Sequence, residues 1–474
     1  MANIHDLPIE LLALIMDILY MNSTRKYSLT GVRYWVDNDL SDPSTFPCSA
    51  ANVCQLWRHI MAAVPHYWTQ FALDLALKEP LPLDALLWSK VLPFKVLIFD
   101  SRLQFSDAQD NAYGLSKEQE QIAVEAITKA LQPHLQRCEA LSYDVRYPSS
   151  IPTLVFALLH CSKKLERLEL DFLHDDREPL LQGYGPRFPL LNSFPWSFPE
   201  LERLSIDAKT FMTAASQFSL RWYDLIASAT SVAGLTLEIS RHTFLGETDD
   251  GPNARSLSQF FHYLAELPLV NILTLRDLSA DPCATNSNLV TLKQPLAAVH
   301  FEGTNLSRNF LSAFFKAFDL PEDEATFVGC AFPSNSSMES SWGLTLKLLP
   351  MNSRFERCFQ VWRGDELTID RCPGFNDDTL DILSEISGYE DCCHASRVRS
   401  LTILNCRNFS YQALKELVLR RKCMAPILDF VEEIEMLAVR GKVPRITKEE
   451  LEWFEGNVPS VYMSDIKRLH TEKS

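Results

Sequence analysis

A short apolar motif that recurs along the chain constrains the fold more than any other feature. The segment LTIDRCPGFNDDTLDIL begins at Leu367 and LTILNCRNFSYQALKEL begins at Leu401, with Leu, Thr, Ile, Cys, Phe and two later Leu in register and no gap. Such repetition is typical of stacked repeats, because one strand and one helix cannot bury an apolar face alone. The motif therefore predicts a solenoid.

Weaker copies of the motif extend this prediction over most of the chain. LERLEL begins at Leu165 and LERLSI begins at Leu201, so these two segments form a second pair. The spacing varies and often exceeds the roughly 20 to 29 residues of regular leucine-rich repeats, which predicts irregular repeats with inserted loops. Further copies are expected at 96–99, 141–145, 235–239, 273–278, 296–301 and 431–437.

Each copy predicts a strand followed by a helix, and therefore an α/β fold with parallel strands along a curved inner wall and helices outside. Side chains alternate along a strand, so Leu367 and Ile369 are expected to point into the solenoid, while Thr368 and Asp370 face the cavity. The two aspartates after Asn376 lack the alternating acids of a calcium loop, and we expect them to begin the helix.

Composition excludes several classes of protein. The chain has 474 residues, 46% of them hydrophobic, which is enough for two or more domains with a sizeable core. Its net charge of −16, without a run of basic residues, argues against nucleic acid as a partner. Glycine is scarce, and GxGxxG, GxxxxGK[ST], GxSxG and HExxH are absent. Since these motifs cradle phosphate or activate a nucleophile or a metal-bound water, we expect no enzyme.

The cysteines indicate reduced thiols rather than a disulfide framework or a metal site. Twelve are scattered along the chain without a CxxC pair or zinc-finger spacing. The adjacent Cys392 and Cys393, with His394, cannot readily chelate one tetrahedral ion. Cys372 and Cys406, at matching positions of the repeat, are expected to fill small buried sites at the strand-to-helix turn. We expect neither a metal nor another cofactor.

The N-terminus predicts neither a secretory signal nor a membrane span. No basic region precedes its apolar stretch, and Glu10 and Asp17 interrupt that stretch. We therefore expect an intracellular protein, cytoplasmic or nuclear, without a membrane partner.

The first part of the chain predicts a small helical unit. Residues 5–20 are expected to form a helix opened by Pro8, whose fixed φ suits a first turn. The apolar residues of this helix cover more than the roughly 100° face that seats a helix on one core, which predicts a second partner surface. The rest of the unit is expected as a loop at 22–47, a helix from about Ser49 to Val64, and a short aromatic element at Trp68 and Phe71.

These residues resemble the F-box, of the fungal type. The resemblance is carried by Leu7-Pro8-x-Glu10-Leu11-x-x-x-Ile15-x-x-x-Leu19, by Val53-Cys54-x-x-Trp57-Arg58 and by Pro65-x-x-Trp68, and the loop between the first two motifs is longer than in the compact form. The resemblance implies three helices that dock on the Skp-type adaptor of a cullin-RING ubiquitin ligase. The positions that match the core and adaptor-facing surface are Leu7, Pro8, Leu11, Ile15, Val53, Cys54 and Trp57.

The long remainder resembles cysteine-containing leucine-rich repeats, which often follow an F-box. We therefore expect an F-box domain at 1–75 with its inserted loop, a linker at 76–93, a repeat solenoid at 94–440 and a C-terminal cap or tail at 441–474. The resemblance implies a substrate-recognition adaptor of an SCF-type ligase. The alternatives are an ordinary N-terminal bundle in place of the F-box, a non-ligase interaction scaffold, and an enzyme.

The target protein is expected to lie along the inner wall of the solenoid. Inserted loops at 174–200 and 246–255 are the other surface considered for recognition, because loops on a rigid scaffold commonly bind partners. Outward residues of the strands are the predicted contacts: Arg167, Glu169, Arg203, Ser205, Glu238, Arg276, Thr368, Asp370 and Thr402.

Overall fold

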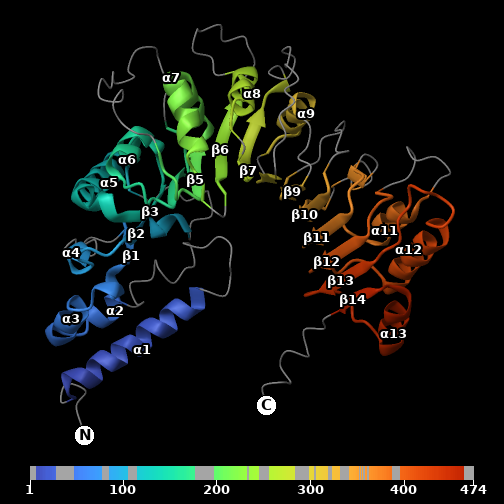
Figure 1. Cartoon of the computed structure of the whole chain (residues 1–474), viewed down its shortest axis with the longest axis horizontal. Coiled ribbons are helices and arrows are strands. Elements are labelled where there is room, and N and C mark those ends of the chain that lie inside the picture. The colour runs from blue at the N-terminus through green and yellow to red at the C-terminus, as the bar shows by residue number, and fades with distance from the viewer. Residues whose placement is uncertain are drawn as a thin grey trace. The chain divides into compact units, whose positions relative to one another are not determined.

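The computed structural model divides into two compact units, Met1–Ile206 with Ser228–Val232, and Asp207–Ala227 with Ala233–Ser474. The elements of each unit are labelled in Figure 1. The structure describes residues 7–27, 47–76, 85–104, 115–176, 197–231, 234–244, 256–268, 270–282, 298–303, 306–318, 323–330, 341–351, 353, 355, 358–359, 362–386 and 395–463.

The first unit begins with helices and continues as strands that alternate with helical segments. Its strands pair in parallel and in chain order. Figure 1 shows α5 and α6 on one side of these strands. The elements are α1 (Ile9–Tyr27), α2 (Cys48–Ala51), α3 (Gln55–Ala62), the 3₁₀ helix η2 (Pro65–Trp68), β1 (Gln70–Asp74), α4 (Ala85–Trp88), β2 (Phe94–Phe99), η3 (Ser101–Gln104), α5 (Lys117–Leu131), η4 (Gln132–Arg137), β3 (Cys138–Val145), η5 (Pro148–Ser150), α6 (Leu154–His160), β4 (Arg167–Phe172) and β5 (Arg203–Asp207).

The second unit repeats the strand-and-helix pattern, again with parallel neighbours in chain order. Figure 1 shows α11, α12 and α13 on one side of the last strands. The elements are α7 (Ala208–Ala227), β6 (Thr236–Phe244), α8 (Leu257–Ala265), β7 (Ile272–Ala280), β8 (Ala298–Glu302), α9 (Arg308–Ala317), β9 (Glu324–Val328), β10 (Gly343–Lys347), β11 (Glu366–Asp370), α11 (Asp377–Ser384), β12 (Ser400–Leu404), α12 (Tyr411–Met424), β13 (Met436–Arg440), α13 (Lys448–Asn457) and β14 (Ser460–Met463).

The helices of the second unit begin at polar caps that recur from repeat to repeat. Each cap side chain accepts a hydrogen bond from the backbone N–H three residues later, which satisfies a donor that the helix itself leaves without a partner. Asn376 caps α11 in this way, with Asp377 and Asp378 in the first turn, so the prediction that these acids begin a helix is confirmed. The other caps of this kind are Ser256, Ser307, Ser410 and Thr447.

In each unit, Figure 1 shows described helices on one side of the strands, and we name the opposite face of the strands the open face. In β11, Leu367 and Ile369 are buried and Thr368 is half-buried, as the alternation predicts. The buried positions align across β6 to β13 into two apolar rows, one of which contains Ile239, Leu275, Phe301, Phe327, Leu346, Ile369, Ile403 and Val439.

The open face of β6 to β12 carries the residues between those rows. Its middle row reads Glu238, Thr274, His300, Thr326, Thr345, Thr368 and Thr402.

The prediction of an α/β fold with parallel strands is confirmed, and strands lie at each predicted copy of the motif. Four of the described strands were not predicted from the sequence: β1, β9, β10 and β14. The predicted aromatic element at Trp68 and Phe71 is wrong as a single element, because Trp68 ends η2 and Phe71 lies in β1. Phe71 aligns with Val96 of β2, so it packs as part of the sheet.

The predicted loop at 22–47 is partly wrong. α1 continues to Tyr27, because the polar residues after Met21 include neither glycine nor proline to end the helix. Residues 28–46 of this loop lie outside the described residues. The segment expected as a linker, 76–93, contains the short helix α4, and the segment expected as a cap or tail, 441–474, contains α13 and β14.

A left-handed residue follows the same register position in eight consecutive strands of the second unit. From β8 to β12, the backbone N–H of this residue donates a hydrogen bond of 2.9 Å to the carbonyl that ends the aligned part of the next strand. Register therefore extends one residue past the paired segment. The eight residues, with positive φ, are Arg241, Asp277, Gly303, Gly329, Leu348, Arg371, Asn405 and Gly441.

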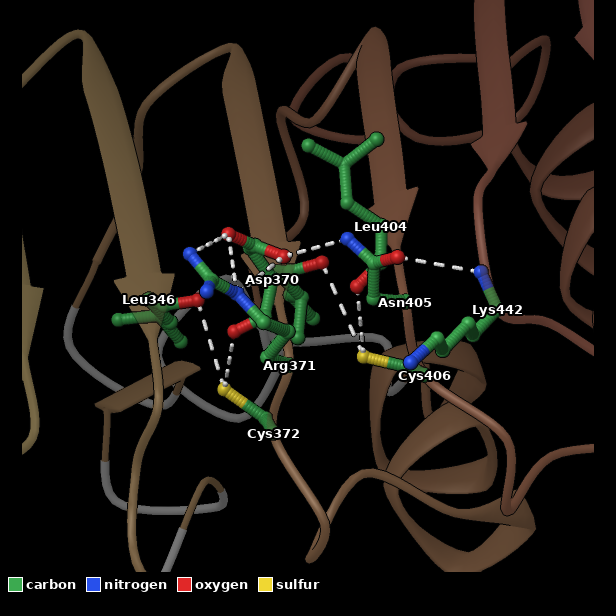
Figure 2. Close-up of polar contacts among 9 residues, drawn as sticks. Leu346, Asp370, Arg371, Cys372, Leu404, Asn405, Cys406 and Lys442 are labelled. Atoms are coloured by element: carbon green, nitrogen blue, oxygen red, sulfur yellow. Dashed lines mark hydrogen bonds and ion pairs between the residues drawn. The ribbon is translucent and has the colours of Figure 1, made fainter. Parts of the chain in front are cut away.

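Figure 2 shows this turn at the ends of β11 and β12. The amide of Asn405 donates to the Asp370 carboxylate over 3.1 Å and accepts from the backbone N–H of Lys442 over 3.1 Å, so one side chain joins three successive repeats. The thiol of Cys372 donates to the carbonyl of Leu346 over 3.4 Å, and the thiol of Cys406 lies 3.9 Å from the carbonyl of Ile369. The prediction that both cysteines fill buried sites at this turn is confirmed.

Candidate functional site

The helix α1 is held in the first unit by buried apolar side chains and by a side-chain hydrogen bond. Leu12 and Met16 are fully buried, and the hydroxyl of Tyr67 donates a hydrogen bond to Asp17. Burial, together with the Asp17 carboxylate, raises the pKa of Tyr67, which keeps the phenol protonated as a donor. The ring of Tyr20 also lies 5.3 Å from the ring of Tyr67. No described helix is long and apolar enough to cross a membrane.

A second apolar stripe runs along the opposite side of α1. Leu11, Leu14, Ile18 and Met21 are spaced three and four apart, so they share one face of the helix, and each is between 47% and 55% exposed. Leu12 and Met16 lie roughly half a turn away from this stripe. α1 therefore presents apolar side chains in two directions, and its own unit buries one of them. We name the four exposed residues the outer stripe.

Two more exposed apolar side chains lie at the start of α3, Val53 and Leu56. Trp57 in the same helix is buried, and its indole N–H has no hydrogen-bond partner among the described residues. A buried donor of this kind is uncommon in folded proteins. η2 follows α3 and is fixed by the indole N–H of Trp68, which donates to the carbonyl of Met61 over 2.9 Å.

The residues predicted to face an adaptor have different positions in the structure. Pro8, Leu11 and Val53 are exposed, and Trp57 belongs to the interior of the unit. Leu7, Ile15 and Cys54 are half-buried.

The set of predicted adaptor residues did not include Leu14, Ile18 and Met21, although these are among the most exposed apolar residues of α1. Their spacing relative to Leu11 is the sequence signal that identifies them.

On the open face, several of the predicted target contacts are engaged in ion pairs with one another. Glu169 and Arg203 lie 2.8 Å apart in the first unit, and Glu238 and Arg276 lie 2.9 Å apart in the second. Burial lowers the pKa of Arg167, which lies beside Glu169 and Arg203. These ion pairs join neighbouring strands, and a partner would have to compete with them.

Three predicted target contacts are buried, which corrects the expectation that they face solvent. Glu238 is covered because Arg276 lies over its carboxylate. Asp370 is covered because its carboxylate accepts hydrogen bonds from Arg371 and Asn405. Ser205 is buried as a short side chain in the row that also contains Glu169. The side chains of Arg167, Glu169, Arg203, Arg276, Thr368 and Thr402 are half-buried.

An open groove of about 680 Å³ lies at the start of β13 and β14. Carboxylates line it, among them Glu432, which forms an ion pair of 2.9 Å with Arg399. Burial raises the pKa of the nearby Asp365, and neighbouring carboxylates add to the effect. The groove is therefore an acidic surface whose charge is compensated in part.

Two other predicted features cannot be placed. Most of the inserted loops predicted at 174–200 and 246–255, and the Cys392-Cys393-His394 segment, lie outside the described residues. Within the ranges that the structure describes, no group of His, Cys, Asp and Glu is arranged to hold a metal ion.

Comparisons with known proteins assign no family. No protein-family model matches the chain, and a search of the curated proteins found no significant match. The resemblances to the F-box and to leucine-rich repeats therefore stay predictions.

Proposed function

We propose that this protein is the substrate-recognition subunit of an SCF-type cullin-RING ubiquitin ligase. In this proposal the helices α1 and α3 dock on a Skp-type adaptor, and the open face of the strands holds a target protein. The chain itself performs no chemistry. It brings a target lysine close to the conjugating enzyme, which raises the effective concentration of the reacting groups.

The outer stripe of α1 is the observation that carries the proposal. Its four side chains are about half exposed, although each contributes roughly 1.5 to 3 kcal/mol when it is fully buried. A contiguous exposed apolar surface of this kind usually marks an interface. The motif residue Leu11 belongs to the outer stripe, and the motif residue Val53, just before α3, is exposed as well. The resemblance to the F-box expects both residues to face the adaptor.

The second candidate function is an interaction scaffold that works outside a ligase. It uses the same apolar surface for a different partner, so the identity of that partner separates the two proposals. The test is purification of the full chain after coexpression with a Skp-type adaptor, with the amounts of both proteins measured. Stoichiometric adaptor supports the ligase proposal, and a folded chain that retains none contradicts it.

Two substitutions show whether α1 is the docking surface. Leu14→Asp places a charge on the outer stripe, and we expect it to abolish copurification of the adaptor. Ile122→Asp is the matched control, because Ile122 is an exposed isoleucine on α5, outside the proposed surface. Both variants should keep the thermal unfolding midpoint of the wild type. Equal adaptor binding by Leu14→Asp and Ile122→Asp would exclude the outer stripe.

A further inference from the structure

The helix α1 exposes more large apolar side chains than it buries. Leu12 and Met16 are fully buried, whereas six others are between 42% and 58% exposed. Apolar surface in water associates with whatever apolar surface it meets, and a second copy of the chain carries the same one. The six exposed residues are Ile9, Leu11, Leu14, Ile18, Leu19 and Met21.

The outer stripe has the spacing of a seam between two helices. Its members follow one another at intervals of three, four and three residues, as the a and d positions of a heptad do. A twofold axis brings the same patch of two copies together, so a stripe of this kind can pack against itself. The stripe covers about one and a half heptads, which is less than the roughly 1,200 Å² of a stable interface requires. A dimer formed through it is therefore weak, with a Kd on the order of 10 μM.

The charged residues of α1 favour a parallel arrangement of two such helices. Glu10 and Asp17 each lie one residue before an a position, so both belong to the same flank of the outer stripe. Ile15 lies on the other flank. In an antiparallel pair the two acidic flanks would face and repel each other. In a parallel pair each acidic flank faces the flank that contains Ile15.

We propose that the outer stripe binds a second copy of this chain, as a parallel pair of α1 helices, when no other partner covers it. Leu12 and Met16 hold the opposite side of α1 in its own unit, which leaves the stripe accessible to another copy. The proposed adaptor contact uses the same side chains, so adaptor and second copy exclude each other. This competition rests on the proposed function, whereas self-association does not.

The first test measures the mass of the full chain, purified without an adaptor, by size-exclusion chromatography with light scattering. Between about 1 and about 200 μM we expect the mass to rise from one chain towards two. Leu14→Asp should raise the midpoint of association at least about tenfold, because it places two like charges in the seam. Ile122→Asp, the matched control on α5, should associate like the wild type.

Three results of this measurement would overturn the inference. The first is a wild-type chain that stays monomeric at the highest concentration. The second is a Leu14→Asp variant that associates like the wild type. The third is a mass that grows beyond two chains, because a contact between identical patches closes at the dimer.

Cross-linking tests the orientation of the two helices. Leu14→Cys and Ile18→Cys each place one thiol in the seam, where a parallel pair brings the same position of both copies together. We expect oxidation with diamide to give a cross-linked dimer from either variant alone. The wild type and Ile122→Cys control for the native thiols, among them Cys54 and Cys423. Cross-linking only in a mixture of the two seam variants would show an antiparallel pair and contradict the proposed arrangement.

Addition of a Skp-type adaptor lets this inference and the proposed function fail separately. We expect equimolar adaptor to convert the dimer into a complex of one chain with one adaptor. A chain that dimerises through the outer stripe but binds no adaptor keeps this inference and loses the ligase proposal. A chain that binds the adaptor but stays monomeric without it keeps the ligase proposal and removes self-association. A complex of two chains with two adaptors would contradict the shared surface.

Discussion

Left-handed residues at the strand ends show how single positions define the repeat. Gly441, which follows β13, packs against the side chain of Asn405 from the preceding repeat. A Cβ on Gly441 would lie 2.3 Å from the Asn405 Oδ1. Gly329 has the same left-handed backbone, but a Cβ added there would meet nothing within 4 Å. A substitution at Gly329 therefore has only the conformational cost of a positive φ, whereas a substitution at Gly441 has this cost and a steric cost as well.

We expect Gly441→Ala to destabilise the protein more than Gly329→Ala. An alanine at positive φ costs roughly 1 to 2 kcal/mol in either place. At Gly441 the methyl group also displaces Asn405 from two hydrogen bonds, each contributing about 0.5 to 1.5 kcal/mol. Urea unfolding of both variants measures the difference. Equal free energies of unfolding would mean that Asn405 does not join the repeats as described.

The buried cysteines give a prediction about reactivity. Burial raises the pKa of the Cys372 thiol to about 12, and burial also raises the pKa of Cys406. The thiolate is the reactive form, so neither should react below pH 9, whereas the exposed Cys423 should. Iodoacetamide treatment of the native chain, followed by peptide mapping, checks this. Labelling of Cys372 at the rate of Cys423 would contradict the buried turn.

At the scale of elements, one side of α1 is buried in the fold and the other side is exposed and available to a partner. We expect Leu12→Ala to cost about 2 to 5 kcal/mol, because the residue is fully buried, and Leu14→Ala to change stability by less than about 0.5 kcal/mol. Loss of protease resistance in the segment that contains α1 measures the first effect. A destabilising Leu14→Ala would place the outer stripe inside the fold and remove the basis of the proposed interface.

Strands with a regular motif could be predicted from the sequence, and strands without one could not. β11 and β12 share Leu-Thr-Ile, whose alternation defines both faces. β9 starts with Glu324 and reads Glu-Ala-Thr-Phe-Val, which lacks the leucine pattern. Its neighbours supply the hydrogen bonds that make it a strand, and this tertiary effect is absent from local propensity. β10 reads Gly-Leu-Thr-Leu-Lys, so its signal was present in the sequence and was missed.

The candidate sites were only partly predictable for a related reason. A pattern identifies which residues are apolar, but not which of two apolar faces a neighbouring element covers, so the exposed Leu14 was not separated from the buried Leu12. Similarly, strand alternation places Glu238 and Glu324 on the open face alike. Only the register reveals that an arginine neutralises the first and that threonines position the second.

For the molecule as a whole, stacked repeats predict stability that depends on neighbours. Each repeat contacts only the next, so an interior strand is held from two sides and a terminal one from one side. In β12 the apolar residues Leu401 and Ile403 are buried, whereas the aligned residues of β14, Val461 and Met463, are only half-buried. β14 is the last strand of the described chain.

We therefore expect hydrogen exchange to proceed inward from β14. Amides of β14 should exchange fastest, those of β13 next, and those of β11 and β12 slowest, because opening of a terminal repeat breaks one interface and opening of an interior repeat breaks two. Exchange followed by mass spectrometry resolves these strands as separate peptides. Gly441→Ala weakens the contact between the repeats of β12 and β13, so it should accelerate exchange in β13 and β14 while β11 keeps its rate. Uniform acceleration across all four strands would show that the repeats unfold as one cooperative block, and the nearest-neighbour description would then be wrong for this chain.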